Sequence, residues 1–166
     1  MVRFSSVVLC ALLAAGCQTA RPEPPFDVGT AAYVLEKGSG RIEGEAFLRK
    51  DSGSVMTAAG ERVYLIPATE YAVARFDRMF GGDRRAYSGV AVGEAPEAYN
   101  RYRRETKVDM KGKFAFENVA PGRYIVATRV FWTEPKSYFT IAQGGAIYDI
   151  VDVEKDETAR AIVSGR

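Results

Sequence analysis

The chain of 166 residues contains no histidine, and it has only two cysteines, Cys10 and Cys17. Histidine is the most common general base and metal ligand, so its absence leaves the serine, cysteine and zinc hydrolase schemes without a required part. An excess of charge of one sign is lacking too, because 23 Lys and Arg residues face 21 Asp and Glu residues. A chain with a net charge of only +2 has no overall field that would require a nucleic acid or an acidic partner.

Both cysteines lie in or just after an apolar segment at the amino terminus. Residues 1–15 have the pattern of an export leader, because the basic residue Arg3 precedes the apolar segment. That segment is shorter than the ~20 apolar residues that a membrane-spanning helix needs. It ends in Leu13-Ala14-Ala15-Gly16-Cys17, which resembles the lipobox of bacterial lipoproteins, with Ala14 where leucine is most common. The resemblance implies a signal peptide over residues 1–16, cleavage between Gly16 and Cys17, and lipid on the Cys17 sulfur. An ordinary secretory leader or an uncleaved anchor is the alternative.

Lipid on Cys17 would determine both the thiol content and the location of the mature protein. Cys10 leaves with the leader and Cys17 is consumed, so the domain must be held together by packing without a disulfide. A lipoprotein cysteine carries a diacylglycerol and usually an amide-linked acyl chain such as palmitate, and two or more chains anchor a protein stably. By resemblance to lipoprotein sorting in enterobacteria, Gln18 in place of Asp favours the outer membrane. We therefore expect a lipid-anchored protein of the cell envelope, facing the periplasm or the surface.

Proline is concentrated directly behind the anchor. Residues 18–27 contain Pro22, Pro24 and Pro25, a composition that stays extended and solvated. We predict a lipidated amino terminus and tether over residues 17–39 and one domain over residues 40–166. Residues 30–35 turn apolar and are expected to add a first edge strand.

The domain has enough apolar residues for a packed core, and most of it alternates with the period of a strand. Residues 41–48 place Ile42, Gly44, Ala46 and Leu48 on one face and charged residues on the other. Glycine and proline separate the segments, with turns at residues 51–53 and with Gly144-Gly145 opening a strand. Further strands are predicted over residues 62–66, 99–108, 113–116, 123–132, 146–153 and 158–164. Short strands at this spacing are typical of an antiparallel sandwich.

One segment has a helical period instead. Thr69 is a suitable cap, and Ala72, Phe76, Met79 and Phe80 fall on one face of the helix that follows. Gly81-Gly82 predicts its end. We expect a short helix that seals one end of the sandwich, or alternatively a lid that holds a ligand.

Residues 106–124 combine a hairpin turn over residues 109–112, alternate core residues Phe114 and Phe116, and a Pro121-Gly122 turn into the strand that bears Tyr124. This combination resembles the carboxypeptidase regulatory-like domain, a transthyretin-like (prealbumin-like) sandwich. The resemblance extends over residues 40–164 and implies an antiparallel Greek-key β-sandwich with one short helix inserted after the second strand. Such modules accompany many different proteins, so the resemblance implies no peptidase activity.

Arginine and tyrosine gather in a basic-aromatic surface. Its members are Arg84, Arg85, Tyr87, Tyr99, Arg101, Tyr102, Arg103 and Arg104. Arginine forks match phosphate oxygens, so at the envelope we expect lipopolysaccharide phosphates or an anionic wall polymer as the partner, and not nucleic acid. The alternative is a charged strand face that discourages edge pairing.

Other aromatic residues are candidates for stacking on sugar rings. Trp132 lies near Tyr138 at the end of the strongest strand, and Tyr71 and Arg75 lie on the helix flank away from Phe76. Packing in the core or at its rim is the alternative. The candidate binding surface therefore comprises Tyr71, Arg75, Arg101, Arg103, Trp132 and Tyr138.

Acidic residues indicate neither a metal nor a catalytic site. The cluster over residues 149–157 lacks the spacing of a calcium loop, so a solvated strand end is expected there. Carboxylates that could support glycoside hydrolysis are present, but no spacing singles out a pair among Glu43, Glu45, Glu61, Glu70 and Asp77. We expect a non-catalytic binding or structural module without cofactor or metal, whose partners are the membrane and an envelope polymer or protein complex. A small carboxylate-dependent envelope hydrolase is the alternative.

Overall fold

A computed structural model describes residues 23–81 and 93–165. In chain order its elements are α1 (Val28–Ala31), the 3-10 helix η1 (Ala32–Leu35), β1 (Lys37–Arg49), β2 (Val55–Thr57), β3 (Arg62–Pro67), α2 (Glu70–Phe80), α3 (Glu97–Arg101), β4 (Arg104–Lys107), β5 (Lys113–Val119), β6 (Gly122–Lys136), β7 (Phe139–Val153) and β8 (Thr158–Val163). No helix within these two ranges has the length and apolarity needed to cross a bilayer.

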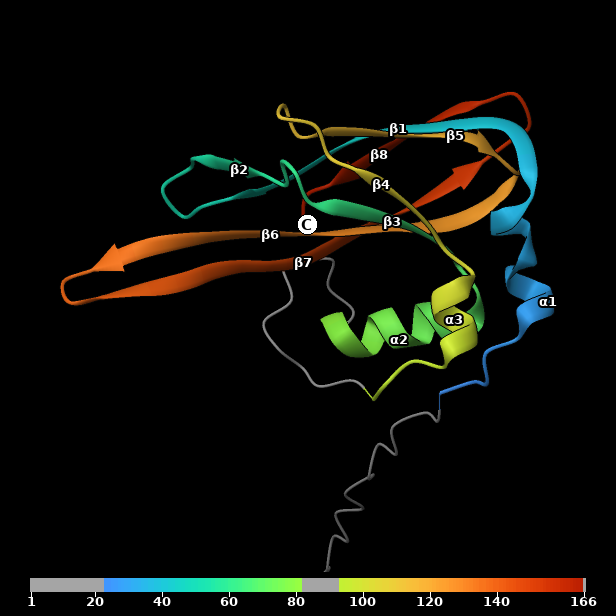
Figure 1. The fold of residues 1–166 in the computed structure, drawn as a ribbon, viewed down its shortest axis with the longest axis horizontal. Coiled ribbons are helices and arrows are strands. Elements are labelled where there is room, and N and C mark those ends of the chain that lie inside the picture. Colours follow the sequence, from blue (N-terminus) through green and yellow to red (C-terminus); the bar gives the residue numbers. More distant parts are fainter. Residues whose placement is uncertain (1–22, 82–92, 166) are drawn as a thin grey trace, which may run out of the picture.

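Two four-stranded sheets form the sandwich (Figure 1). The first has the order β2-β1-β5, with β8 paired to β1, and the second has the order β4-β3-β6-β7. This confirms the predicted mainly β, antiparallel sandwich with a short helix after the second predicted strand. The one parallel pair in the described residues joins β1 to β8, because β8 enters the first sheet from β7 of the second sheet through residues 154–157.

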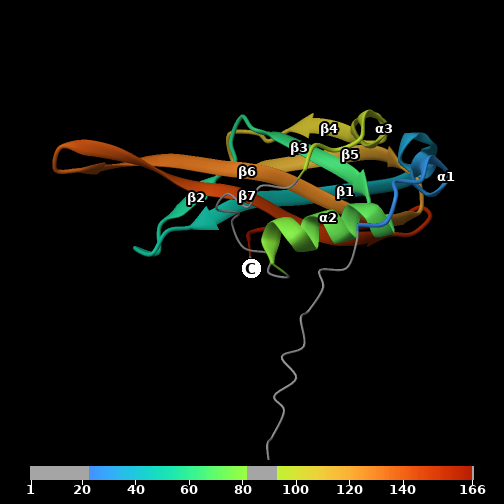
Figure 2. The same ribbon diagram turned by 90° about the horizontal axis from the view of Figure 1, so that it is seen from below.

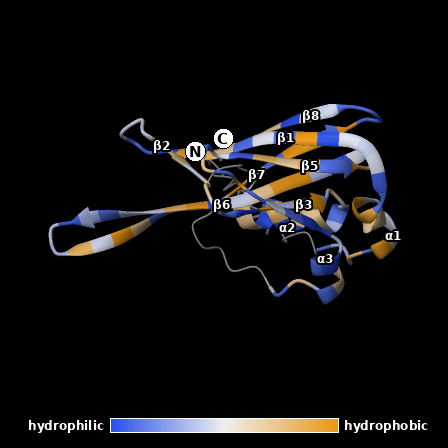
Figure 3. Ribbon diagram, turned by 45° about the horizontal axis from the view of Figure 1, so that its top comes forward, coloured by the Kyte–Doolittle hydropathy of each residue, from blue (hydrophilic) through white to orange (hydrophobic). Residues whose placement is uncertain are grey.

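The core between the sheets comes from alternate residues of the strands, an alternation visible in Figure 3. Ile42, Leu65, Tyr124, Val126 and Ile147 are all completely buried. Burying an apolar side chain of this size stabilises a fold by about 1.5–3 kcal/mol. Because the domain contains no cysteine that could form a disulfide, its stability depends on this hydrophobic packing.

Helix α2 forms a third layer on the outer face of the second sheet (Figures 1 and 2). The Thr69 hydroxyl accepts a hydrogen bond from the Ala72 N–H, and Gly81 ends the helix in the left-handed conformation at φ 64°. The Phe76 ring meets the Tyr148 ring edge-on, with 4.9 Å between the centroids. The expectation that this helix seals one end of the sandwich is wrong, because outward-facing apolar residues of the sheet, such as Ile125, need cover.

The predicted edge strand over residues 30–35 is also wrong, since the segment forms α1 and η1. Asp27 caps α1 by accepting a hydrogen bond of 2.8 Å from the Gly29 N–H. Ala31 and Val34 are buried, and the Tyr33 hydroxyl donates to the Arg123 carbonyl. Residues assigned to the tether over 17–39 therefore already pack on the sandwich.

The predicted strand over residues 99–108 is divided between a helix and a shorter strand. Residues Glu97–Arg101 form α3, and Arg104–Lys107 form β4. Tyr99 is buried against Phe26 and Tyr71, with ring centroids 5.6 Å and 5.2 Å away. This local aromatic cluster stabilises the helical turn over the extended conformation that the alternation predicts.

The turn over residues 109–112 forms as predicted, but it does not join two strands of one sheet. The Asp109 carboxylate accepts hydrogen bonds of 2.8 Å from the Lys111 and Lys113 N–H groups. The turn carries the chain from β4 in the second sheet to β5 in the first. It is a connection between sheets and not a hairpin.

Strands β6 and β7 form a long hairpin that projects beyond the rest of the sandwich (Figure 1). Gly144 and Gly145 lie inside β7, opposite Phe131 and Val130, and do not open the strand as predicted. A Cβ atom at Gly144 would lie 2.0 Å from the Val130 carbonyl oxygen. The two glycines therefore permit a close approach of the strands within the hairpin.

Candidate functional site

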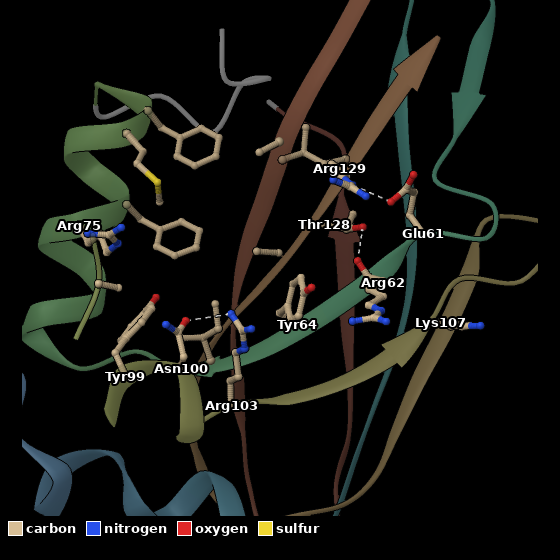
Figure 4. A pocket seen from close by; sticks show the side chains of 18 of the residues that line it. Glu61, Arg62, Tyr64, Arg75, Tyr99, Asn100, Arg103, Lys107, Thr128 and Arg129 are labelled. Atoms are coloured by element: carbon tan, nitrogen blue, oxygen red, sulfur yellow. Dashed lines mark hydrogen bonds and ion pairs between the residues drawn. The ribbon is translucent and has the colours of Figure 1, made fainter. Parts of the chain in front are cut away.

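A cavity of about 720 Å³ lies between the helices α2 and α3 and the outer face of the second sheet (Figure 4). Its volume is within the range of small-molecule sites. The described residues that line it are Gly60, Glu61, Arg62, Tyr64, Ile66, Arg75, Phe76, Met79, Phe80, Ala95, Tyr99, Asn100, Arg103, Lys107, Ala127, Thr128, Arg129, Ala146 and Ile147.

Apolar side chains form the inner surface of the cavity. Ile66 and Ala127 come from the sheet, and Phe76, Met79 and Phe80 come from α2. Phe76 and Phe80 stack on each other at 5.8 Å, with 8° between their planes. Charged and polar groups beside such a surface interact more strongly than they would in water.

The charges around the cavity are mainly positive. The lining contains five cationic side chains and, within the described ranges, a single carboxylate, that of Glu61. Glu61 is already bound by Arg129, whose Nε lies 2.7 Å from its Oε2. Arg62 pairs with Glu105, a residue outside the lining, at 3.7 Å. No carboxylate of residues 23–81 and 93–165 lies within ion-pair distance of the remaining cations of the lining, Arg75, Arg103 and Lys107.

Arg103 is held in place by two neighbours. Its guanidinium carbon lies 4.5 Å from the centroid of the Tyr64 ring, a cation–π contact. Its Nη1 donates a hydrogen bond of 3.2 Å to the Asn100 side-chain oxygen. Figure 4 shows Arg75 on the opposite wall, on α2, with Tyr99 between the two arginines.

The tyrosine at this end of the cavity stays protonated over the physiological range. Burial raises the pKa of Tyr99 to about 12, and the nearby Arg75 and Arg103 act against this rise. Burial also raises the pKa of Tyr71, which packs on Tyr99. Both hydroxyl groups are therefore neutral near pH 7.

The structure brings together only part of the candidate binding surface from the sequence. Arg75 and Arg103 line the cavity, and Tyr71 packs behind Tyr99. Arg101 lies outside the lining on α3 and pairs with Glu97 at 4.0 Å. The other predicted residues, namely Arg84, Arg85, Tyr87 and the lipidation residue Cys17, lie outside the described residues.

Trp132 and Tyr138 lie on the β6–β7 hairpin, away from the cavity lining. The Trp132 indole donates a hydrogen bond of 2.9 Å to Glu134, and the Lys50 ammonium group lies 5.2 Å from the ring centroid. Tyr138 is 99% exposed at the tip. Trp132 and Tyr138 are grouped with Arg75 in the candidate binding surface because their side chains could contact a ligand. This chemical similarity does not predict that they lie in one site.

Sequence reasoning missed several residues of the cavity. Arg62 and Tyr64 occupy outward positions of β3, in alternation with the buried residues Val63 and Leu65. Alternation in that segment predicts their outward direction, but not that a helix lies opposite them. The other missed polar members are Asn100, Lys107, Thr128 and Arg129.

The described part of the cavity contains no pair of carboxylates. Glycoside hydrolysis by the usual route needs two, about 5–9.5 Å apart, whereas Glu61 stands alone and is neutralised by Arg129. Across residues 23–81 and 93–165, no three His, Cys, Asp or Glu side chains are grouped to hold a metal ion. The described side chains of the cavity supply hydrogen-bonding and charged groups.

No protein-family model matches the chain. No curated protein matches it either. Among solved structures, the chain is similar to a crystal structure of a Pseudomonas aeruginosa protein described as a "putative carbohydrate binding protein", with a TM-score of 0.74 and 23% sequence identity. The similarity covers 86% of this chain and 99% of that one. At this level of identity, the comparison shows that the two share a fold.

Proposed function

We propose that the protein is a carbohydrate-binding module of the bacterial cell envelope, held on the membrane by lipid on Cys17 and without catalytic activity of its own. The lipobox at residues 13–17 supports the anchor. The turn at Asp109 and the buried Phe114 and Phe116 support membership of the carboxypeptidase regulatory-like sandwiches.

The observation that carries the proposal is the cavity between α2 and the second sheet. It combines an apolar surface with hydrogen-bonding groups of Tyr64, Asn100 and Arg103. A sugar ring presents both apolar C–H faces and hydroxyl groups, so it matches a site with these two kinds of surface. The description of the Pseudomonas aeruginosa protein of the same fold points to the same class of ligand.

A glycan array probed with the full-length, detergent-solubilised protein tests this function. We expect binding to a subset of glycans, and loss of that binding in Ala127→Trp, because Ala127 lines the cavity and the larger ring would fill it. The matched control is Ala115→Trp on β5, which introduces the same ring at a half-buried position of the other sheet. Tyr138→Ala should bind like the parent protein.

Two results would count against the proposal. The first is an array on which the parent protein binds no glycan. The second is binding that survives Ala127→Trp while the circular dichroism spectrum remains that of the parent, because the ligand would then lie elsewhere.

A further inference from the structure

We propose that the ligand of the cavity is an acidic saccharide, whose carboxylate or phosphate group binds at the end of the cavity that holds Arg75 and Arg103. The inference rests on the proposed function and adds to it the chemical class of the sugar. Three observations carry it: the excess of positive charge around the cavity, the contrast with the arginines nearby, and the arrangement of the two guanidinium groups.

The excess of positive charge is local to the cavity. In the described lining, Arg75, Arg103 and Lys107 have no carboxylate partner among the residues that the structure describes, and the one acid present, Glu61, is neutralised by Arg129. A neutral sugar would leave these three cations uncompensated beside the apolar side chains of α2. An anionic group on the ligand would supply the missing partner.

Arginines close in sequence but outside the lining do have partners. Arg78, one turn after Arg75 on α2, pairs with Glu23 at 3.0 Å. Arg101 pairs with Glu97. Arg75 and Arg103 differ from these two neighbours, because neither has a carboxylate partner among the described residues. This contrast supports an anionic partner from outside the described residues, such as a ligand.

The two guanidinium groups lie at the same end of the cavity, because each is close enough to the buried Tyr99 side chain to act on it electrostatically. Arg75 projects from α2 and Arg103 from the segment that joins α3 to β4, on opposite sides of Tyr99 (Figure 4). Arg103 is restrained by the Tyr64 ring and the Asn100 amide, so less side-chain entropy is lost when it binds. A guanidinium group donates two parallel hydrogen bonds to a carboxylate or a phosphate, and such charge-assisted bonds are among the stronger ones.

The test compares acidic and neutral forms of the same sugars on the full-length, detergent-solubilised protein. The glycan array contains uronic acid and phosphorylated glycans beside their neutral counterparts, and calorimetry follows with oligogalacturonate and its methyl ester. We expect the ester to bind at least about tenfold more weakly, since it loses the charge and keeps the ring. Glucose 6-phosphate against glucose separates a phosphate from a carboxylate as the preferred anion.

Three variants locate the anion in the cavity. Arg75→Gln and Arg103→Gln should each weaken binding of the acidic sugar about tenfold or more, because each removes a charge-assisted hydrogen bond. Arg101→Gln is the matched control, since it removes an exposed arginine outside the lining, and it should stay within about twofold of the parent. Thermal unfolding by circular dichroism shows whether the variants fold like the parent.

The outcomes separate the inference from the function on which it rests. Equal binding of ester and acid, or binding confined to neutral glycans, overturns the acidic ligand and leaves carbohydrate binding in place. Equal losses in Arg75→Gln and Arg101→Gln also overturn it, because the effect would then come from net charge alone. Binding to no glycan of either kind removes the function as well.

Discussion

Two tyrosine side chains are buried in different parts of the protein. Tyr124 lies in the core between the two sheets, and Tyr99 lies in the cluster between α2 and the second sheet. The Tyr124 side chain is completely buried and donates a hydrogen bond of 2.8 Å to the Ala120 carbonyl oxygen. Tyr99 is 6% exposed in the cluster beneath α2. Burial raises the pKa of both, because a phenolate loses most of its hydration in such surroundings. Each hydroxyl therefore acts as a neutral hydrogen-bonding group at physiological pH.

The raised pKa of Tyr99 predicts a loss of stability at alkaline pH. Below pH 10.0 the tyrosine is protonated in both folded and unfolded chains and contributes no pH dependence. Between pH 10.0 and about 12, the unfolded chain releases the proton while the folded chain keeps it, so the free energy of unfolding falls as the pH rises. The fall is about 3 kcal/mol over this interval.

Urea unfolding at a series of alkaline pH values measures this fall, with tyrosinate absorbance as a second signal. Tyr99→Phe should unfold with a shallower dependence on pH, while Tyr124 continues to contribute its own part. An identical slope in the variant and the parent would show that Tyr99 ionises with an ordinary pKa in the folded protein.

At the scale of the elements, α2 links the sandwich to the candidate site. Its cap residue Thr69 lies two residues after Pro67, the last residue of β3, so the strand and the helix that line the cavity are joined by a single short connection. Its buried face holds it against the sheet, and Arg75 lies on the flank that faces the cavity. The position of Arg75 therefore depends on how well the first turn of the helix is formed.

Thr69→Ala should destabilise the protein by about 1 kcal/mol, because the Ala72 N–H loses its side-chain acceptor. Urea unfolding measures the change. Thr69→Ser keeps an acceptor at the same place and should lie much closer to the parent. Equal losses in the two variants would assign the effect to the missing methyl group instead of the cap.

Close packing of β1 against its neighbours predicts a larger effect at Gly44. A Cβ atom there would lie 2.3 Å from the Phe114 ring and 2.7 Å from the Ala161 carbonyl oxygen of β8. Gly44→Ala should therefore destabilise the protein by about 1–3 kcal/mol. Gly93→Ala is the matched control, since a Cβ atom at Gly93 meets nothing within 4 Å. A Gly44→Ala variant as stable as the Gly93→Ala variant would contradict the packing described for β1.

At the scale of the whole molecule, the described residues form three layers, and the sequence before them contains residues 13–17, which resemble a lipobox. This resemblance predicts that the protein is recovered with membranes and that its amino terminus is an acylated cysteine. Cys17→Ser should move the protein from the membrane fraction to the soluble fraction, because the lipidated sulfur is lost. Mass spectrometry of the native amino terminus provides the direct measurement. An unmodified Cys17 or an intact leader would contradict the anchor.

Much of the fold follows from patterns between near neighbours in the chain. The alternation of Ile42, Gly44, Ala46 and Leu48 predicts the inward face of β1 because successive strand residues point to opposite sides. Thr69 and Gly81 predict the limits of α2 because caps are local interactions. The cationic site could be predicted only in part, through Arg75 and Arg103.

The sequence by itself determined the strand faces, the helix with its caps, the turn at Asp109 and the need for a core without disulfides. The tertiary structure alone decided that residues 97–101 are helical, that β8 lies parallel to β1 and that Arg75 and Arg103 line the same cavity. The reason is physical: a periodic pattern specifies which side of a segment is apolar, but not which other segment will cover it. A cavity forms where two such surfaces meet incompletely, and that depends on the packing of residues distant in the chain.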